Sequence, residues 1–141
     1  MYVLSKLSLK RLEGVHPKLS ELFKRAIVGS PHDFMVVQGL RTAEYQRELY
    51  SQGRTKPGKI VTNCDGYKFK SNHQAKSDGY GHAVDFAIYD PSISGNIDWD
   101  NNKKYKEVAE HLKKIAEEMK INIEWGGDWR KFKDYPHIEL K

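Results

Sequence analysis

Cysteine is nearly absent from this sequence, and long hydrophobic runs are missing altogether. Cys64 is the single cysteine in 141 residues, so the chain cannot form an internal disulfide. The longest interior apolar run, Phe34 to Val37, is far shorter than the roughly 20 residues that cross a bilayer, which excludes a membrane-spanning helix. Lysines and serines interrupt residues 1–10 and exclude the apolar core of a signal peptide. We therefore expect synthesis and folding in the cytoplasm, without membrane insertion.

The sequence also lacks internal repeats, low-complexity tracts and a linker rich in serine and proline. A chain of 141 residues is long enough to bury its own core without disulfides. We therefore expect residues 1–141 to form a single domain.

Positive charge is in modest excess but is not clustered. Lys and Arg number 24 against 19 Asp and Glu, which gives a formal net charge of +5. The lysines in 103–120 alternate with glutamates, as is typical of an exposed helix face with ion pairs between turns. This charge would suit any polyanion, including a bacterial envelope. We do not expect nucleic acid to be the partner, although nucleic-acid binding stays an alternative.

Apolar periodicity divides the chain into helices and short strands. Helices are expected over 17–28, 42–53 and 103–120, and strands over 33–38, 82–88, 121–125 and 136–140. Residues 54–80 are polar and aperiodic, and loops of this length are more often functional or mobile than neutral. Because regular βαβ alternation is missing, this order predicts an α+β fold. We expect a small antiparallel or mixed sheet flanked by about three helices.

Asp85 is the unusual residue of its predicted strand. The apolar residues that alternate along 84–88 make one face of the strand hydrophobic, so Asp85 lies on the other face among small neighbours. A carboxylate in that position needs a cation, a metal or several donors. His82 falls on the face opposite to Asp85 if the strand is regular, whereas His73 comes from the preceding loop and has no such restriction.

A second carboxylate, Asp134, comes three residues before His137 at the start of the last predicted strand. Two histidines and one carboxylate can form a catalytic zinc site with a fourth position left for water. A further carboxylate could then take the proton of that water as a general base. The alternative is a salt-bridged Asp85 with two surface histidines. The remaining histidines are expected to be ordinary surface or capping residues: His16, His32 and His111.

Several motifs occur in the order of a known peptidase family. Ser71-Asn72-His73, followed by Gly81-His82-Ala83-Val84-Asp85, resembles the Ser-x-His-x-x-Gly-x-Ala-x-Asp signature of a group of zinc peptidases. That group includes D-alanyl-D-alanine carboxypeptidases and dipeptidases and the L-alanyl-D-glutamate endopeptidases of bacteriophage endolysins. Further stretches are similar to the endolysin branch, in the same order and over nearly the whole chain: Ser30–Phe34 with Val37–Thr42, Gly95–Trp99, Trp125–Trp129 and Asp134–Leu140.

The resemblance implies a zinc ion on the face of the sheet, with Asp134 as the general base. The implied zinc ligands are His73, Asp85 and His137. One departure concerns spacing, because the family histidine comes seven residues before the aspartate and here 85 − 73 = 12, so five residues are extra. Asp78 occupies the position that the family spacing assigns to the histidine. The longer loop costs only about 0.5 kcal/mol in closure entropy, so we expect His73 to be the ligand ahead of His82 and Asp78.

The resemblance also implies that Arg41 contacts the substrate and stabilises charge on the reacting carbonyl. The alternative for Arg41 is a surface salt bridge. Gln38 and Ser71 are expected to contact the substrate or support the site, with a structural role as the alternative for each. Trp125 and Trp129 are as consistent with core or rim packing as with substrate binding and receive no assigned role.

Together these features are similar to an endolysin, a zinc-dependent peptidoglycan hydrolase that cleaves the L-alanyl-D-glutamate bond of the stem peptide. The resemblance implies a monomer without a separate cell-wall-binding domain, made in the host cytoplasm and released to the cell wall or periplasm by a separate holin-like factor. One alternative is a D-alanyl-D-alanine carboxypeptidase or dipeptidase of the same fold. Another is a non-catalytic domain that binds the cell wall or nucleic acid.

Overall fold

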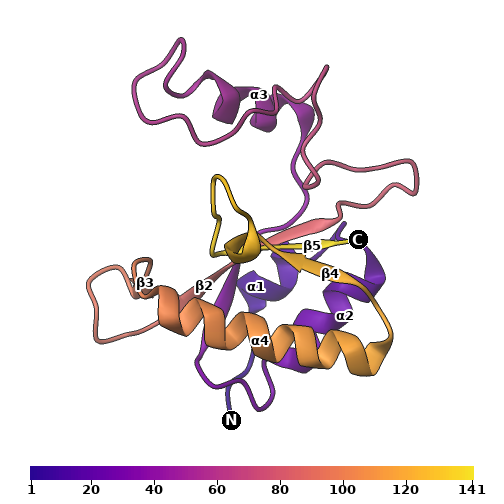
Figure 1. Cartoon of the computed structure of the whole chain (residues 1–141), viewed down its shortest axis with the longest axis vertical. Helices are drawn as coiled ribbons and strands as arrows, with labels where there is room; N and C mark the ends of the chain where they lie inside the picture. Colours follow the sequence, from indigo (N-terminus) through magenta and orange to yellow (C-terminus); the bar gives the residue numbers. More distant parts are fainter.

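Four α-helices and one antiparallel sheet make up the fold (Figure 1). The computed structural model describes residues 1–141. The helices are α1 (Lys6–Arg11), α2 (Pro17–Ala26), α3 (Ala43–Ser51) and α4 (Asn102–Met119). The strands are β1 (Phe34–Gln38), β2 (Ala83–Tyr89), β3 (Ile97–Asp98), β4 (Ile123–Trp125) and β5 (His137–Leu140), and a short 3-10 helix, η1 (Gly126–Asp128), follows β4.

The strand order places β2 at the centre of the sheet. The order is β1-β2-β5-β4, with β3 paired to one end of β2, and every pair is antiparallel. The register sets Asp85 of β2 opposite Gln38 on one side and His137 on the other. The residues of β2 that alternate with Asp85 enter the hydrophobic core: Val84, Phe86 and Ile88.

Helices α2 and α4 supply most of the apolar side chains that cover this face of the sheet. Phe86 lies between Phe34 and Tyr105, with ring centroids 6.0 and 5.5 Å away. In Figure 1, α2 and α4 lie close to each other beside the sheet, whereas α3 and the long loop after it stand apart from them. Packing of one face of β2 in the core therefore fixes the position of the strand, and with it the position of Asp85 on the opposite face.

Local capping signals explain where two of the helices begin. Pro17 is the first residue of α2, where a missing N–H is tolerated, and Nδ1 of His16 accepts a hydrogen bond from the Lys18 amide at 3.1 Å. The Thr42 hydroxyl accepts a hydrogen bond from the Tyr45 amide at 3.1 Å at the start of α3. The predicted starts of these two helices are therefore confirmed.

The α+β prediction with an antiparallel sheet is confirmed, and 54–80 contains no helix or strand. The sequence prediction missed α1 and β3, so the fold has four helices rather than about three. Helix α1 is short and depends on tertiary contacts, since the buried Ser8 hydroxyl accepts a hydrogen bond from the Val36 amide of β1 at 3.0 Å. None of the helices combines the length and apolar composition that crossing a membrane requires.

Candidate metal centre

His73, Asp85 and His137 meet on the face of the sheet that is turned away from the core helices. His73 Nε2 lies 3.3 Å from Asp85 Oδ1, and His137 Nδ1 lies 3.2 Å from the same oxygen. One donor atom from each of the three residues lies within 4.8 Å of the other two. The residues come from three segments: the loop before β2, the middle of β2, and the start of β5. The fold thus brings together the three ligands that the sequence predicts.

The loop carrying His73 is fixed against the chain that follows β1. His73 Nδ1 lies 2.9 Å from the carbonyl oxygen of Gly39, and the carbonyl of His73 accepts a hydrogen bond from the Arg41 amide at 2.8 Å. A Cβ atom at Gly39 would lie 2.0 Å from the Arg11 carbonyl oxygen, so only glycine fits this approach. Because a carbonyl oxygen only accepts, Nδ1 of His73 donates to Gly39, and Nε2 is the nitrogen that faces Asp85.

The longer spacing between His73 and Asp85 is taken up by a turn that projects from the site. Within this turn, the Lys76 amide donates to the Tyr80 carbonyl at 3.0 Å, and the His82 amide donates to the Asn72 carbonyl at 2.8 Å where the two ends meet. Asp78 Oδ2 lies 2.7 Å from Nε2 of His82, so these two alternative ligands pair with each other. The extra residues therefore leave His73 in place.

His137 is oriented by a chain of polar side chains on its far side. Its Nε2 lies 2.8 Å from Glu139 Oε1, and Asn72 donates to the other oxygen of Glu139 at 3.1 Å. Lys76 in turn donates to Asn72 Oδ1 at 2.8 Å. Because Nε2 is engaged in this way, Nδ1 is the nitrogen of His137 that faces Asp85. Supporting contacts of this kind are typical of histidines that bind metals.

The charges of this cluster are strongly coupled in the metal-free chain. Burial alone would raise the pKa of Asp85, but hydrogen bonds from His137 and His73 and their positive charges hold that pKa well below its usual range. Burial would lower the pKa of His137, but its hydrogen bonds to Asp85 and Glu139 outweigh this effect and raise the pKa to about 9. The hydrogen bond from His137 lowers the pKa of Glu139.

Arg41 reaches the same carboxylate from the segment between β1 and α3. Its Nη2 lies 3.3 Å from Asp85 Oδ2, and Nη1 donates to Oε1 of the buried Gln46 at 3.0 Å. Burial lowers the pKa of Arg41, and the charge of Asp85 opposes that shift. Gln46 Nε2 also donates to the Cys64 carbonyl at 2.9 Å, so one side chain links Arg41 to the long loop. Arg41 is therefore held beside the candidate metal ligands.

Asp134 lies at the edge of the cluster, in the loop between η1 and β5. Its amide donates to the Gly126 carbonyl at 3.0 Å, and its own carbonyl accepts from the His137 amide at 3.1 Å. Burial is the main cause that raises the pKa of Asp134, and the negative charge of Asp85 raises it further. A carboxylate with a raised pKa beside a metal site can exchange a proton with water more readily than an ordinary aspartate.

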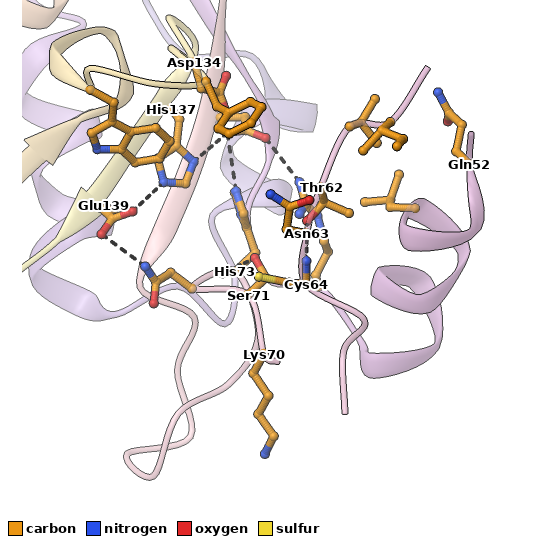
Figure 2. A pocket seen from close by; sticks show the side chains of 18 of the residues that line it. Gln52, Thr62, Asn63, Cys64, Lys70, Ser71, His73, Asp134, His137 and Glu139 are labelled. Atoms are coloured by element: carbon orange, nitrogen blue, oxygen red, sulfur yellow. Dashed lines mark hydrogen bonds and ion pairs between the residues drawn. The ribbon is translucent and has the colours of Figure 1, made fainter. Parts of the chain in front are cut away.

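A pocket of about 960 Å³ opens over the cluster. Figure 2 shows Asp134 and His137 on one side of this pocket and Thr62 and Asn63 on the other, with His73 between them. The pocket lining includes six of the seven residues predicted from the sequence: Arg41, Ser71, His73, Asp85, Asp134 and His137.

Gln38, the seventh predicted residue, does not line the pocket, and its side chain donates to the Leu40 carbonyl at 3.4 Å.

Sequence reasoning missed several residues that shape the site. Glu139 follows His137 by two positions in β5, so strand periodicity places both on one face and could have identified it. The ring of Trp129 packs 5.1 Å from the ring of His137, between centroids. Asn72 and Gln46 act through contacts between distant segments, and no local pattern marks them.

The donor set fits a zinc ion. Two imidazole nitrogens and a carboxylate oxygen, with open space above them, form the ligand set of many catalytic zinc sites. The Gly39 carbonyl holds Nδ1 of His73, and the Glu139 carboxylate holds Nε2 of His137. Such contacts to the other ring nitrogen are the usual companions of zinc-bound histidines.

Comparisons with known proteins identify the family of this chain. The family model described as phage L-alanyl-D-glutamate peptidase matches residues 1–141. The peptidoglycan L-alanyl-D-glutamate endopeptidase CwlK of Bacillus subtilis (strain 168) is 37% identical over 123 residues, covering 86% of this chain and 68% of CwlK. The L-alanyl-D-glutamate peptidase of Escherichia phage T5 is 33% identical over 134 residues, covering 95% of this chain and 85% of that protein.

Structural similarity extends over the whole chain. The crystal structure of the Serratia marcescens L-Ala D-Glu endopeptidase ChiX matches with a TM-score of 0.75 and 30% sequence identity, covering 100% of this chain and 90% of ChiX. The family match over the full length, the two relatives and the shared fold all lead to one assignment. This chain belongs to the phage L-alanyl-D-glutamate peptidase family.

Proposed function

We propose that this protein is a zinc-dependent peptidoglycan hydrolase that cleaves the L-alanyl-D-glutamate bond of the stem peptide. The family assignment supports the reaction class and the substrate. The observation that carries the proposal is the set of three donor atoms within 4.8 Å of one another, at the floor of a pocket that Arg41 and Asp134 also line. A binding-only domain has no need of this arrangement.

In this proposal His73, Asp85 and His137 hold the zinc ion. Bound there, zinc would supply a Lewis acid that polarises the peptide carbonyl and lowers the pKa of a water molecule. His137 would coordinate through Nδ1 and His73 through Nε2, because these are the nitrogens that face Asp85.

Asp134 is the proposed general base. It takes a proton from the attacking water and delivers it to the nitrogen of the leaving amine, so no covalent intermediate with the protein forms. Its raised pKa makes it a stronger base toward the attacking water, and the protonated carboxyl is still far more acidic than an ammonium group, so it can pass the proton on to the leaving amine. The Gly126 carbonyl and the His137 amide anchor its backbone at 3.0 and 3.1 Å, and Asp134 lines the same pocket as the three proposed ligands.

Arg41 is the proposed stabiliser of the negative charge that develops on the carbonyl oxygen. Gln46 and Asp85 hold its guanidinium in place from two sides, so little reorganisation is needed during the reaction. Arg41 shares the pocket with Lys70 and Lys133, and this positive lining suits the carboxylate of D-glutamate. Ser71 is a proposed substrate contact from the same lining, and Gln38 a proposed supporting residue behind Asp85.

We also propose that the protein works as a monomer on the cell wall and reaches it with the help of a separate holin-like factor. The match to a phage peptidase family supports this setting. Size-exclusion chromatography coupled to light scattering tests the monomer, and lysis timing with and without a co-expressed holin tests the release.

The test of the proposed chemistry is the variant Asp134→Asn, assayed on purified peptidoglycan. Loss of a general base lowers the rate by about 10²–10⁴-fold, while one zinc ion per chain should stay bound. Asp128→Asn is the matched control, because Asp128 is exposed in the same part of the chain and pairs with Lys113. New amino-terminal D-glutamate is the expected product. Release of D-alanine would instead identify a carboxypeptidase or dipeptidase, and near-normal activity of Asp134→Asn would remove Asp134 from the mechanism.

A further inference from the structure

Phe132 has a backbone conformation and an exposure that its local structure does not explain. Its φ angle is +54°, in the left-handed region that bulky side chains rarely adopt, and 82% of its surface is exposed. Two other non-glycine residues share a positive φ: Asn96, a residue type that tolerates it, and Lys120, which ends α4. Phe132 is not a residue type that tolerates a positive φ, and it does not end a helix. A strained residue beside an active site points to a functional role.

The strain at Phe132 is maintained by a loop that is pinned at both ends. The Gly126 carbonyl accepts hydrogen bonds from the Trp129 amide at 3.3 Å and from the Asp134 amide at 3.0 Å. Lys133, next to Phe132, reaches back with its Nζ to the Gly127 carbonyl at 3.1 Å. These contacts close the loop on itself, and Phe132 lies exposed within it. The ring of Phe132 is thereby presented to the pocket instead of the core.

Other exposed apolar side chains line the same pocket and come from the long loop over residues 54–80. Ile60 and Val61 in the long loop are 58% and 57% exposed, and both line the pocket together with Phe132. Apolar side chains left in water at the rim of a pocket usually mark a surface that becomes covered on binding. The three proposed metal ligands and Arg41 belong to the polar lining of the same pocket.

We propose that Phe132 is a substrate-contact residue, whose ring covers the bound stem peptide together with Ile60 and Val61. This inference rests on the proposed function, because the occupant is the acidic peptide that the site hydrolyses. The small apolar residue before the scissile bond packs against these apolar side chains, while Lys70 faces the carboxylates.

The strain gives this proposal a signature that a structural role would not produce. Phe132 lies outside the core cluster, so its ring contributes little packing to the folded state. Asparagine tolerates the left-handed conformation better than phenylalanine. Replacing Phe132 by Asn should therefore leave the melting temperature unchanged or raise it, while substrate binding weakens. A residue that stabilises the loop would show the reverse.

The experiment compares Phe132→Asn, Phe132→Tyr and Lys131→Asn in the zinc-loaded protein, with a soluble stem peptide that contains the L-alanyl-D-glutamate bond. Lys131 is the matched control because it is exposed in the same loop and does not line the pocket. We expect Phe132→Asn to raise KM at least fivefold with kcat within twofold of wild type and no fall in Tm. Phe132→Tyr should retain the wild-type KM.

A KM for Phe132→Asn equal to that of Lys131→Asn would overturn the proposal, and so would a parallel loss of Tm and kcat. Calorimetric binding of the same peptide to Asp134→Asn, with and without Phe132→Asn, separates this inference from the proposed function. If wild type does not hydrolyse the peptide but binding still depends on Phe132, the proposed function fails and the contact stands. If the protein hydrolyses the peptide and binding is independent of Phe132, the contact fails alone.

Discussion

Glu139→Gln tests whether the contacts behind His137 set the affinity for zinc. Glu139 is held ionised by its hydrogen bond from His137, at 2.8 Å between Nε2 and Oε1, and it also accepts from Asn72 at 3.1 Å. Glutamine keeps the shape but loses the charge. It also presents one NH₂ group to a site where both neighbours donate, so one hydrogen bond is replaced by a contact between two donors.

The expected effect on zinc affinity follows from these two bonds. Loss of a supporting contact to a metal-bound histidine costs about 10- to 100-fold in metal affinity, which corresponds to about 1.4–2.8 kcal/mol. At pH 7 the effect should fall near the lower end, because Glu139 also stabilises the proton on His137 that competes with zinc. Above pH 9 that competition disappears and the loss should approach the upper end.

The assay is a competition between the protein and a zinc-chelating dye, at pH 7 and again at pH 9.5. Glu124→Gln is the matched control, because Glu124 lies opposite Glu139 on β4 and pairs with Lys141 at 3.5 Å. A zinc affinity for Glu139→Gln within twofold of Glu124→Gln at both pH values would refute the reasoning, since His137 would then be oriented without Glu139.

Two further predictions concern protonation and the core. His137 has a pKa raised to about 9 in the metal-free chain, so it is protonated at pH 7 and zinc must displace that proton from Nδ1. Calorimetry at pH 7 in buffers of different ionisation enthalpy should show about one proton released from this residue, and apparent zinc affinity should rise as pH increases toward 9 and level off above it. Zero release would contradict the ion pair between His137 and Asp85. Phe86→Ala should lower the free energy of unfolding by about 3–5 kcal/mol, because Phe86 is fully buried between Phe34 and Tyr105. Chemical denaturation measures this, with the exposed Phe69→Ala as a control expected within about 0.5 kcal/mol of wild type; equal effects of the two variants would place Phe86 outside the core.

The sequence predicted the parts of the site that regular strands arrange. Period-two alternation in β2 separates Asp85 from the core residues beside it, and the antiparallel register then sets His137 opposite. Helix α1 was not predicted because a contact between distant segments holds it in place. The buried hydroxyl of Ser8 in α1 accepts a hydrogen bond from the Val36 amide of β1. No periodicity encodes such contacts.

The position of His73 was predictable only with the family resemblance, since loop residues carry no periodic signal. Its geometry depends on the Gly39 carbonyl and on the turn within 74–80, both of which are tertiary features. Glu139 could have been inferred from its spacing to His137 in β5. Gln46 could not, because its role comes from linking Arg41 to the Cys64 carbonyl across the pocket wall.

The turn that absorbs the extra residues between His73 and Asp85 separates loop length from site geometry. Its ends are joined at Asn72 and His82, and its tip around Gly79 points into open space. Residues can therefore be gained or lost at this tip without moving a metal ligand. The same property makes the tip a natural graft point, where an epitope, a fluorophore or a wall-targeting peptide could be inserted close to the pocket while the proposed zinc ligands keep their positions.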